Sequence, residues 1–242
     1  MYRLILAAAG LAAMTAPALA DSVTLTPNDL AGVDEDMPRI AYGDAPTPEF
    51  GPDSWVNSAT GKVNAYVGDG VDASGVFSGT KSLFGRQVGF SEITAVSYYT
   101  KPPTDAGDDD WFVNFYTEAD GVDDNAGWYG KRFTLVAEQS ALGNGWFLNT
   151  VTGFKSTSGS TSGTTFSFSQ LATNFAGEMW GAISPQTNSG DKGSDAQIDG
   201  LRVELSGGEV GTVDFAAASV PSPSIAMGGL ILAGVTALRR RK

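Results

Sequence analysis

Residues 111–118 read Trp-Phe-Val-Asn-Phe-Tyr-Thr-Glu, a run of aromatic, β-branched and polar side chains. Successive side chains of an extended chain point to opposite faces, so Trp111, Val113 and Phe115 share one face of this run. Alternation of this kind over eight residues is typical of a half-buried strand. The run is bordered by clusters of Asp and Gly, which are typical of turns. We therefore predict a strand here, with a turn at each end.

The same pattern recurs through the middle of the chain. Short alternating runs are separated by Gly, Asp, Asn, Ser and Pro, and no long segment has helical periodicity. Many short strands with Gly-rich turns predict an all-β domain at residues 55–219, and they favour a jelly-roll-like two-sheet β-sandwich over an immunoglobulin sandwich. The further predicted strands are Lys62–Val67, Ile93–Tyr99, Lys131–Glu138, Trp146–Val151, Thr164–Ser169, Met179–Ser184, Leu201–Leu205 and Val210–Phe215.

Some segments of the middle region are predicted to differ from plain strands. Asn28–Asp53 contains four prolines and few apolar pairs, so we assign residues 21–54 as an extended N-terminal strap over the sandwich. Ser206–Glu209 predicts the turn of a final hairpin, and Gln170–Phe175 predicts one helical turn. The Ser-, Thr- and Gly-rich segment Ser156–Thr165 predicts an exposed loop.

The composition excludes several classes of site. The chain has 242 residues with neither cysteine nor histidine, which rules out disulfides, thiolate sites, a Ser-His-Asp triad and a histidine zinc site. Five of the 15 basic residues lie in the first three or last four positions, so the middle carries 10 basic against 27 acidic residues. Such a domain repels nucleic acid and anionic lipid, and we expect neither as a partner.

The N-terminus has the pattern of a secretory signal peptide. Arg3 precedes the apolar stretch Leu4–Ala13, and Ala18-Leu19-Ala20 forms a small-residue cleavage motif before Asp21. We assign residues 1–20 as a signal helix removed during export, with cleavage directed by Ala18 and Ala20. A buried N-terminal helix is the alternative.

The C-terminus has the pattern of a short membrane anchor. Val220-Pro221-Ser222-Pro223 precedes the apolar run Ile225–Leu238, and Arg239, Arg240, Arg241 and Lys242 end the chain. Fourteen helical residues extend about 21 Å, short of the ~30 Å hydrocarbon core, so the short hydrophobic helix is a marginal span. Its basic end would remain in the cytoplasm, and the inner membrane would hold the chain before processing.

This order of proline motif, apolar helix and terminal Arg cluster resembles the PEP-CTERM sorting signal over residues 220–242. The resemblance implies an exosortase-type sorting enzyme as a partner, in addition to the export machinery, and an exported protein of bacteria that often make exopolysaccharide. Val220, Pro221, Pro223 and the Arg239–Arg241 cluster match the pattern, whereas Ser222 stands where the usual motif has Glu. An ordinary tail anchor is the alternative, and both place the domain outside the inner membrane.

Acidic loops are candidate calcium sites. Asp105 and Asp108–Asp110 precede the 111–118 run, and Asp120, Asp123, Asp124 and Asn125 follow it. Calcium prefers six to eight oxygen ligands, which such loops supply, although neither loop has EF-hand spacing. Turn chemistry is the alternative, because Asp and Asn also favour turns. The 120–125 loop is the better candidate.

Aromatic residues beside this loop are candidate glycan contacts. Trp128 and Tyr129 are flanked by Gly, and exposed aromatic rings stack on sugar rings. The Trp-rich strands and Ile198–Glu204 also resemble lectin-like sandwich domains, a likeness that assigns no functional residue. Trp55, Tyr98 and Tyr116 are further candidates, with core packing as the alternative for each.

Catalysis has little support from the sequence. Two facing carboxylates suffice for glycoside hydrolysis, but no motif pairs Glu92, Glu118, Glu138, Glu178 or Glu204. We expect a non-enzymatic, exported surface or matrix protein without a required cofactor, acting through a structural or adhesive sandwich. The alternatives are a calcium-dependent, lectin-like module for exopolysaccharide or surface glycans and a polysaccharide-active enzyme.

Overall fold

The computed structural model describes residues 19–26, 38–64, 79–102, 111–119, 129–188 and 193–216. These residues form twelve strands and two short α-helices, α1 (Gly79–Phe84) and α2 (Phe168–Asn174). The strands are β1 (Leu19–Leu25), β2 (Arg39–Ala41), β3 (Ser54–Val56), β4 (Val88–Gly89), β5 (Ile93–Lys101), β6 (Phe112–Glu118), β7 (Tyr129–Ala141), β8 (Phe147–Ser156), β9 (Thr165–Phe166), β10 (Met179–Gln186), β11 (Gln197–Leu205) and β12 (Val210–Phe215).

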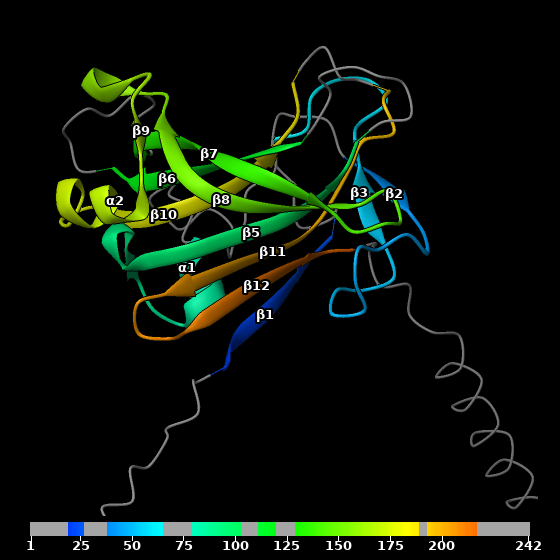
Figure 1. The fold of residues 1–242 in the computed structure, drawn as a ribbon, viewed down its shortest axis with the longest axis horizontal. Coiled ribbons are helices and arrows are strands. Elements are labelled where there is room, and N and C mark those ends of the chain that lie inside the picture. The colour runs from blue at the N-terminus through cyan, green and yellow to red at the C-terminus, as the bar shows by residue number, and fades with distance from the viewer. Residues whose placement is uncertain are drawn as a thin grey trace, which may run out of the picture.

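The strands form one continuous, curled sheet. Its order is β1-β12-β11-β5-β8-β7-β6-β10-β4, with β3 pairing with β11, β2 with β3, and β9 with β8. Only β1 and β12 run parallel among the described pairs. Figure 1 shows β1, β12, β11 and β5 side by side at the front, and β6 and β10 behind β8 and β7. The all-β, jelly-roll-like prediction is confirmed, with the two layers formed by the halves of one sheet.

Aromatic side chains fill the space between the two layers. Trp111, Val113 and Phe115 are buried at 3 % exposure or less, as the alternation predicted. Phe133 lies at the centre of a ring cluster, with its ring centroid 5.0 Å from that of Phe90 and 5.1 Å from that of Phe175. Such rings bury large apolar areas, so this cluster provides much of the driving force for folding.

Helix α1 lies near the place where the two ends of the sheet approach each other. It contacts β1 and β12 on one side and β10 on the other. Gly211 in β12 permits this packing, because a Cβ there would lie 2.8 Å from the Phe84 ring. The Phe84 ring centroid lies 6.2 Å from that of Trp180 in β10. Arg86, just after the helix, donates to both Glu92 and Glu209 and ties this corner to the turn between β11 and β12.

Local signals predicted several elements within one or two residues. The helical turn is α2, where Ser167 and Gln170 form a reciprocal capping box. The final hairpin turn lies between β11 and β12, with Gly208 at φ 83°. The predicted strand Thr164–Ser169 is wrong in its second half, because Ser167 caps the helix and leaves only Thr165–Phe166 as β9.

The sequence analysis missed the short elements that depend on distant partners. Strand β2 lies inside the segment 21–54 predicted as a strap and pairs with β3, which begins at the last residue of that segment and pairs with β11. Of the predicted strand Lys62–Val67, residues 62–64 are described, and Asn64 forms an isolated bridge with Gln186. Helix α1 had no sequence signal that we recognised.

Residues 1–18 of the predicted signal helix and the whole predicted C-terminal helix lie outside the described residues, whereas Leu19 and Ala20 are strand and not helix. Among the residues that are described, no helix is long and apolar enough to cross a membrane. Strand β1 begins at Leu19, so the expected cleavage after Ala20 lies within this strand, and Ser22–Leu25 pair with Thr212–Phe215 of β12.

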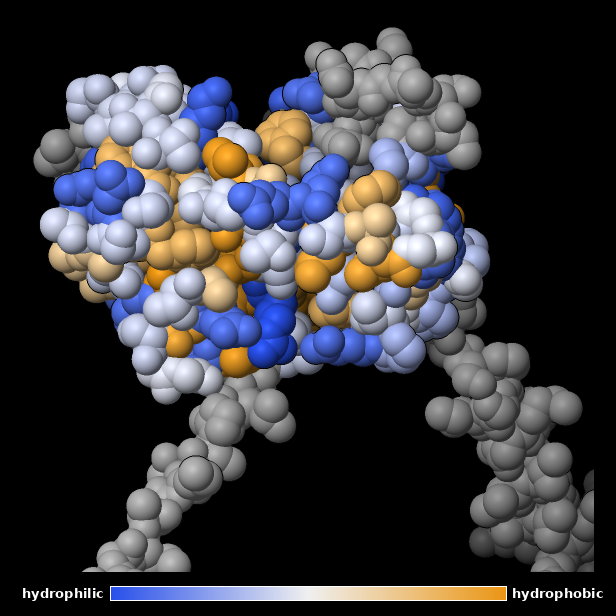
Figure 2. All heavy atoms as spheres, in the orientation of Figure 1, coloured by the Kyte–Doolittle hydropathy of each residue, from blue (hydrophilic) through white to orange (hydrophobic). Residues whose placement is uncertain are grey.

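Figure 2 shows how the side chains are distributed on one face. Apolar side chains gather in the left half, over the end of the sheet where α2 lies in Figure 1. Met179 and Val136 are among the exposed apolar residues, at 41 % and 37 % exposure.

Candidate functional site

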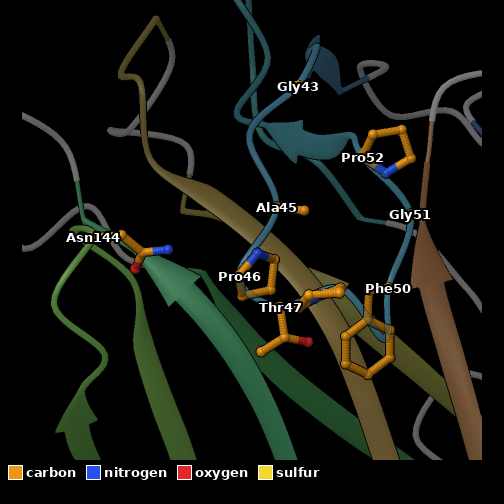
Figure 3. Close-up of a pocket in the computed structure, with 9 residues that line it drawn as sticks. Gly43, Ala45, Pro46, Thr47, Phe50, Gly51, Pro52 and Asn144 are labelled. Atoms are coloured by element: carbon orange, nitrogen blue, oxygen red, sulfur yellow. The ribbon is translucent and has the colours of Figure 1, made fainter.

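A pocket lies where the loop between β2 and β3, residues 42–53, faces the turn between β7 and β8. Its volume is about 590 Å³, within the range of small-molecule sites. Figure 3 shows Asn144 of the β7–β8 turn across from Ala45, Pro46 and Thr47. The lining residues are Gly43, Ala45, Pro46, Thr47, Pro48, Phe50, Gly51, Pro52 and Asn144.

The β2–β3 loop has little regular structure because its prolines remove backbone donors. Side-chain contacts shape it instead. Asp44 accepts hydrogen bonds from Lys101 Nζ at 2.5 Å, Trp146 Nε1 at 3.0 Å and Gln197 Nε2 at 3.1 Å. These donors come from β5, from the end of the β7–β8 turn and from β11. One carboxylate thus fixes the loop to three distant parts of the sheet.

The environment of Asp44 favours its charged form. Burial raises the pKa of this carboxyl, but the hydrogen bonds from Lys101, Trp146 and Gln197 outweigh burial and leave the pKa below its ordinary value. The anchor is therefore ionised at neutral pH.

A second anchor holds the other end of the loop. Phe50 is buried, and its ring centroid lies 5.6 Å from that of Tyr99. The ring lies over Gly200, which has φ +56° and where a Cβ would lie 2.5 Å from the Phe50 ring. The amide of Gly51 donates to Asp214 Oδ1 at 3.1 Å. Aromatic packing and one backbone hydrogen bond thus seat this end on β5, β11 and β12.

The β7–β8 turn presents Asn144 to the pocket. Gly143 and Gly145 flank it at φ 91° and 88°, a conformation that side chains other than glycine rarely adopt. The carboxamide oxygen of Asn144 accepts a hydrogen bond from the Trp146 amide at 3.2 Å. This contact orients the side chain so that its amide nitrogen can serve as a donor.

The pocket lining contains no ionisable side chain. Its polar groups are Thr47, the Asn144 carboxamide and backbone atoms, and its apolar groups include three proline rings and Phe50. The hydroxyl oxygen of Thr47 is buried and makes no hydrogen bond. Tyr42, next to the lining residue Gly43, is 76 % exposed. Such a surface can stack and hydrogen-bond a neutral ligand, and it offers no carboxylate pair for hydrolysis.

The predicted glycan and calcium residues are only partly described. Tyr129 begins β7 half-buried, and its ring meets that of Tyr116 edge to face at 5.0 Å. Trp128 and the predicted calcium ligands Asp120, Asp123, Asp124 and Asn125 lie outside the described residues, as do Ala18 and the sorting motif from Val220 to Arg241. Within the described ranges, no group of three or more acidic side chains is placed to hold a metal ion.

The other aromatic candidates are core residues. Trp55 is fully buried and donates its indole N–H to the Ala216 carbonyl, and Tyr98 and Tyr116 are 5 % and 3 % exposed. For these three, the packing alternative is the correct interpretation.

Four of the five candidate catalytic glutamates have a structural partner. Glu92 pairs with Arg86, Glu178 with Lys131 and Glu204 with Arg202. Glu118 accepts from the Gln87 amide at 2.7 Å, and Glu138 is exposed on β7. Ion pairing accounts for three of these glutamates, a hydrogen bond for Glu118 and solvent exposure for Glu138.

Sequence reasoning did not find the pocket residues. The prolines of residues 42–53 fell within the predicted strap, residues 143–145 were not singled out, and nothing in the sequence places these segments face to face. No family model, curated protein or solved structure matches the chain.

Proposed function

We propose that the protein is an exported, non-catalytic adhesive module of the bacterial surface or extracellular matrix, and that the pocket between the β2–β3 loop and Asn144 binds a neutral sugar unit of a polysaccharide. The observation that carries this proposal is the lining, which combines apolar rings with a few neutral polar groups and has no ionisable side chain.

The chemistry of a sugar matches this lining. A pyranose ring has apolar C–H faces and hydroxyl edges, so it packs against rings while its edges exchange hydrogen bonds. The Asn144 carboxamide and backbone atoms supply the polar contacts, and exposed Tyr42, next to the lining residue Gly43, offers an aromatic face nearby. A pocket of about 590 Å³ accommodates one or two sugar units of a longer chain.

The termini support the surface location within this proposal. The signal-like residues 1–20 and the PEP-CTERM-like residues 220–242 would export the chain and hold it at the inner membrane for an exosortase-type enzyme. Intact mass of surface-extracted protein that lacks Arg239–Lys242 would support processing, and a mass that retains them would contradict it.

The test is binding of the purified protein to neutral polysaccharides and to the exopolysaccharide of the host. We expect binding that Asn144→Ala weakens by about fivefold to tenfold, the loss of one hydrogen bond. Asn174→Ala is the matched control, because Asn174 is an exposed asparagine at the end of α2. Equal binding by wild type and Asn144→Ala would exclude this pocket.

A calcium-dependent, lectin-like site near Asp120–Tyr129 is the second candidate, motivated by half-buried Tyr129 beside Tyr116. Binding with calcium that a chelator abolishes, and that Trp128→Ala removes, would favour this site. No binding under either condition would leave a purely structural role.

A further inference from the structure

Asp199 is a buried carboxylate that is only half satisfied. It lies on β11, where a β-bulge shifts the register with β5 between Asp199 and Arg202. Its side chain is fully buried. Oδ1 accepts from the Gly200 amide at 2.7 Å and the Phe215 amide at 3.1 Å, whereas Oδ2 is buried without a hydrogen-bond partner. A buried polar atom without a partner calls for a physical explanation.

The charges of two further carboxylates, Asp214 and Asp53, act on Asp199. Asp214 on β12 accepts from the Gly51 amide of the β2–β3 loop, and Asp53 in that loop accepts from the Gly43 amide at 3.2 Å. Burial raises the pKa of Asp199 to about 8; the amides of Phe215 and Gly200 act in the opposite direction, and the charges of Asp214 and Asp53 raise it further. Burial and the charge of Asp53 also raise the pKa of Asp214.

A proton is the ligand that fits this cluster. Among the described residues, no three acidic side chains are placed to hold a metal ion. An unpartnered neutral carboxyl costs far less to bury than an unpartnered charged one. Burial of Oδ2 without a partner therefore favours the protonated form of Asp199 over the ionised form.

We propose that Asp199, Asp214 and Asp53 form a proton-controlled latch that holds the β2–β3 loop on the sheet: the loop stays seated while Asp199 is protonated and lifts when Asp199 ionises. When the loop lifts, Asp199 gives one proton to the solvent, and water reaches its carboxylate. The Gly51–Asp214 hydrogen bond and the Phe50–Gly200 contact break in the same movement, because both join the loop to β11 and β12.

Other charged or titratable groups also face the cluster. Glu49 from the loop and Arg202 from β11 lie 3.8 Å apart, and both side chains are partly exposed. Tyr99 of β5 has its pKa raised by burial and by the nearby Glu49 and Asp199, so it stays neutral. Asp199 is the fully buried carboxyl of this cluster, and its ionisation is the change on which the latch depends.

The sign of the pH dependence follows from linkage. The pKa of Asp199 in the folded protein lies above that of a solvent-exposed aspartate. The latch is therefore strongest at pH values below the ordinary pKa of aspartate. It weakens as pH rises, and the weakening ends once pH exceeds about 8. Each pH unit inside this window increases the open fraction by up to about tenfold. Because the loop forms the pocket, ligand affinity would fall over the same range, a consequence that rests on the proposed function.

Hydrogen exchange of the intact protein tests the latch without any sugar. After correction for the intrinsic exchange rate, we expect protection of residues 42–53 to fall by up to about 100-fold between pH 6 and pH 8, and to level off above. Residues 129–141 of β7 serve as the internal control and should stay protected. Asp199→Asn keeps an acceptor oxygen and cannot ionise, so the loop should remain protected at every pH.

A second variant keeps the test decisive if Asp199→Asn does not fold. Asp214→Asn retains the acceptor for Gly51 and removes the neighbouring charge, so the loss of protection should be smaller than in wild type. A loop whose protection is constant with pH in wild type, or falls equally in Asp199→Asn, would overturn the latch. Sugar binding that is equal at pH 6 and pH 9 would also overturn the latch, but it would leave the proposed function intact. A loop whose protection depends on pH in a protein that binds no sugar would reject only the proposed function.

Discussion

The aromatic end of the sandwich and the β2–β3 loop are held in place by different forces. At the aromatic end, Phe90, Phe133 and Phe154 are fully buried and meet ring to ring. The loop of twelve residues with three prolines is held chiefly by the ionised Asp44, the buried Phe50 ring and the Gly51 hydrogen bond, with Glu49 beside Arg202. Apolar packing does not depend on pH, whereas carboxylate contacts do, so the difference separates the stability of the fold from the stability of the site.

The largest effect is expected from the aromatic end. Phe133→Ala removes a fully buried ring from contacts with Phe90, Phe166 and Phe175, and it should lower the free energy of unfolding by about 3–5 kcal/mol. Urea unfolding measures this loss. Phe168→Ala is the control, because Phe168 is half-buried and should lose clearly less. If both variants lost the same amount, the cluster would not be the centre of the core.

The next effect is expected where the loop meets the sheet. Gly200→Ala places a Cβ 2.5 Å from the Phe50 ring at φ +56°, so it should lower the free energy of unfolding by about 2–4 kcal/mol. It should also increase hydrogen exchange of residues 42–53. Gly207→Ala is the matched control, since its nearest neighbour is the Glu209 side chain at 3.6 Å. A stable Gly200→Ala protein with a protected loop would show that Phe50 does not require the glycine.

A smaller effect is expected at the ionised anchor. Asp44→Ala removes the acceptor for Lys101, Trp146 and Gln197, and it should lower stability by about 1–2 kcal/mol because the ion pair is partly exposed. Because the pKa of Asp44 is lowered in the folded protein, Asp44 stabilises the fold at pH values above the ordinary aspartate pKa. This stabilisation is lost as the pH falls through the lowered pKa. Asp44→Asn should remove this acid dependence in unfolding curves. Acid curves unchanged in Asp44→Asn would assign the dependence to another carboxylate.

The smallest effect on stability is expected at the pocket rim. Tyr42 is 76 % exposed, so Tyr42→Ala should change the free energy of unfolding by no more than about 0.5 kcal/mol. Sugar affinity should nevertheless fall, and Tyr42→Phe should retain it, because stacking needs the ring and not the hydroxyl. Thermal unfolding and binding to the same polysaccharide distinguish the two effects. A loss of stability without a loss of binding would place Tyr42 in the fold and not in the site.

The strands could be predicted because their signals are local. The alternation around Trp111 and Phe115 sets which side chains are buried, and the capping pair Ser167 and Gln170 marks α2. Both depend on side chains a few residues apart, which the chain orders without reference to the rest of the fold. The boundary of β9 was misjudged because a β-rich run also contained this cap.

The pocket could not be predicted in the same way. Asp44 meets Trp146 and Gln197 across 102 and 153 positions, and Phe50 requires the bulge at Gly200. A proline-rich segment has no periodicity from which its partners could be read. The predicted loop 120–125 and Trp128 remain predictions, as does the sorting tail.

The sequence by itself determined the all-β class, the position of most strands and the absence of cysteine and histidine chemistry, because periodicity and composition are properties of the chain. Only the tertiary structure decided that the sheet is continuous, that the β2–β3 loop faces the β7–β8 turn, and that Asp199 is buried beside Asp214 and Asp53. The physical reason is that burial and electrostatic coupling depend on which distant segments come together, and that is decided when the whole sheet curls around its aromatic core.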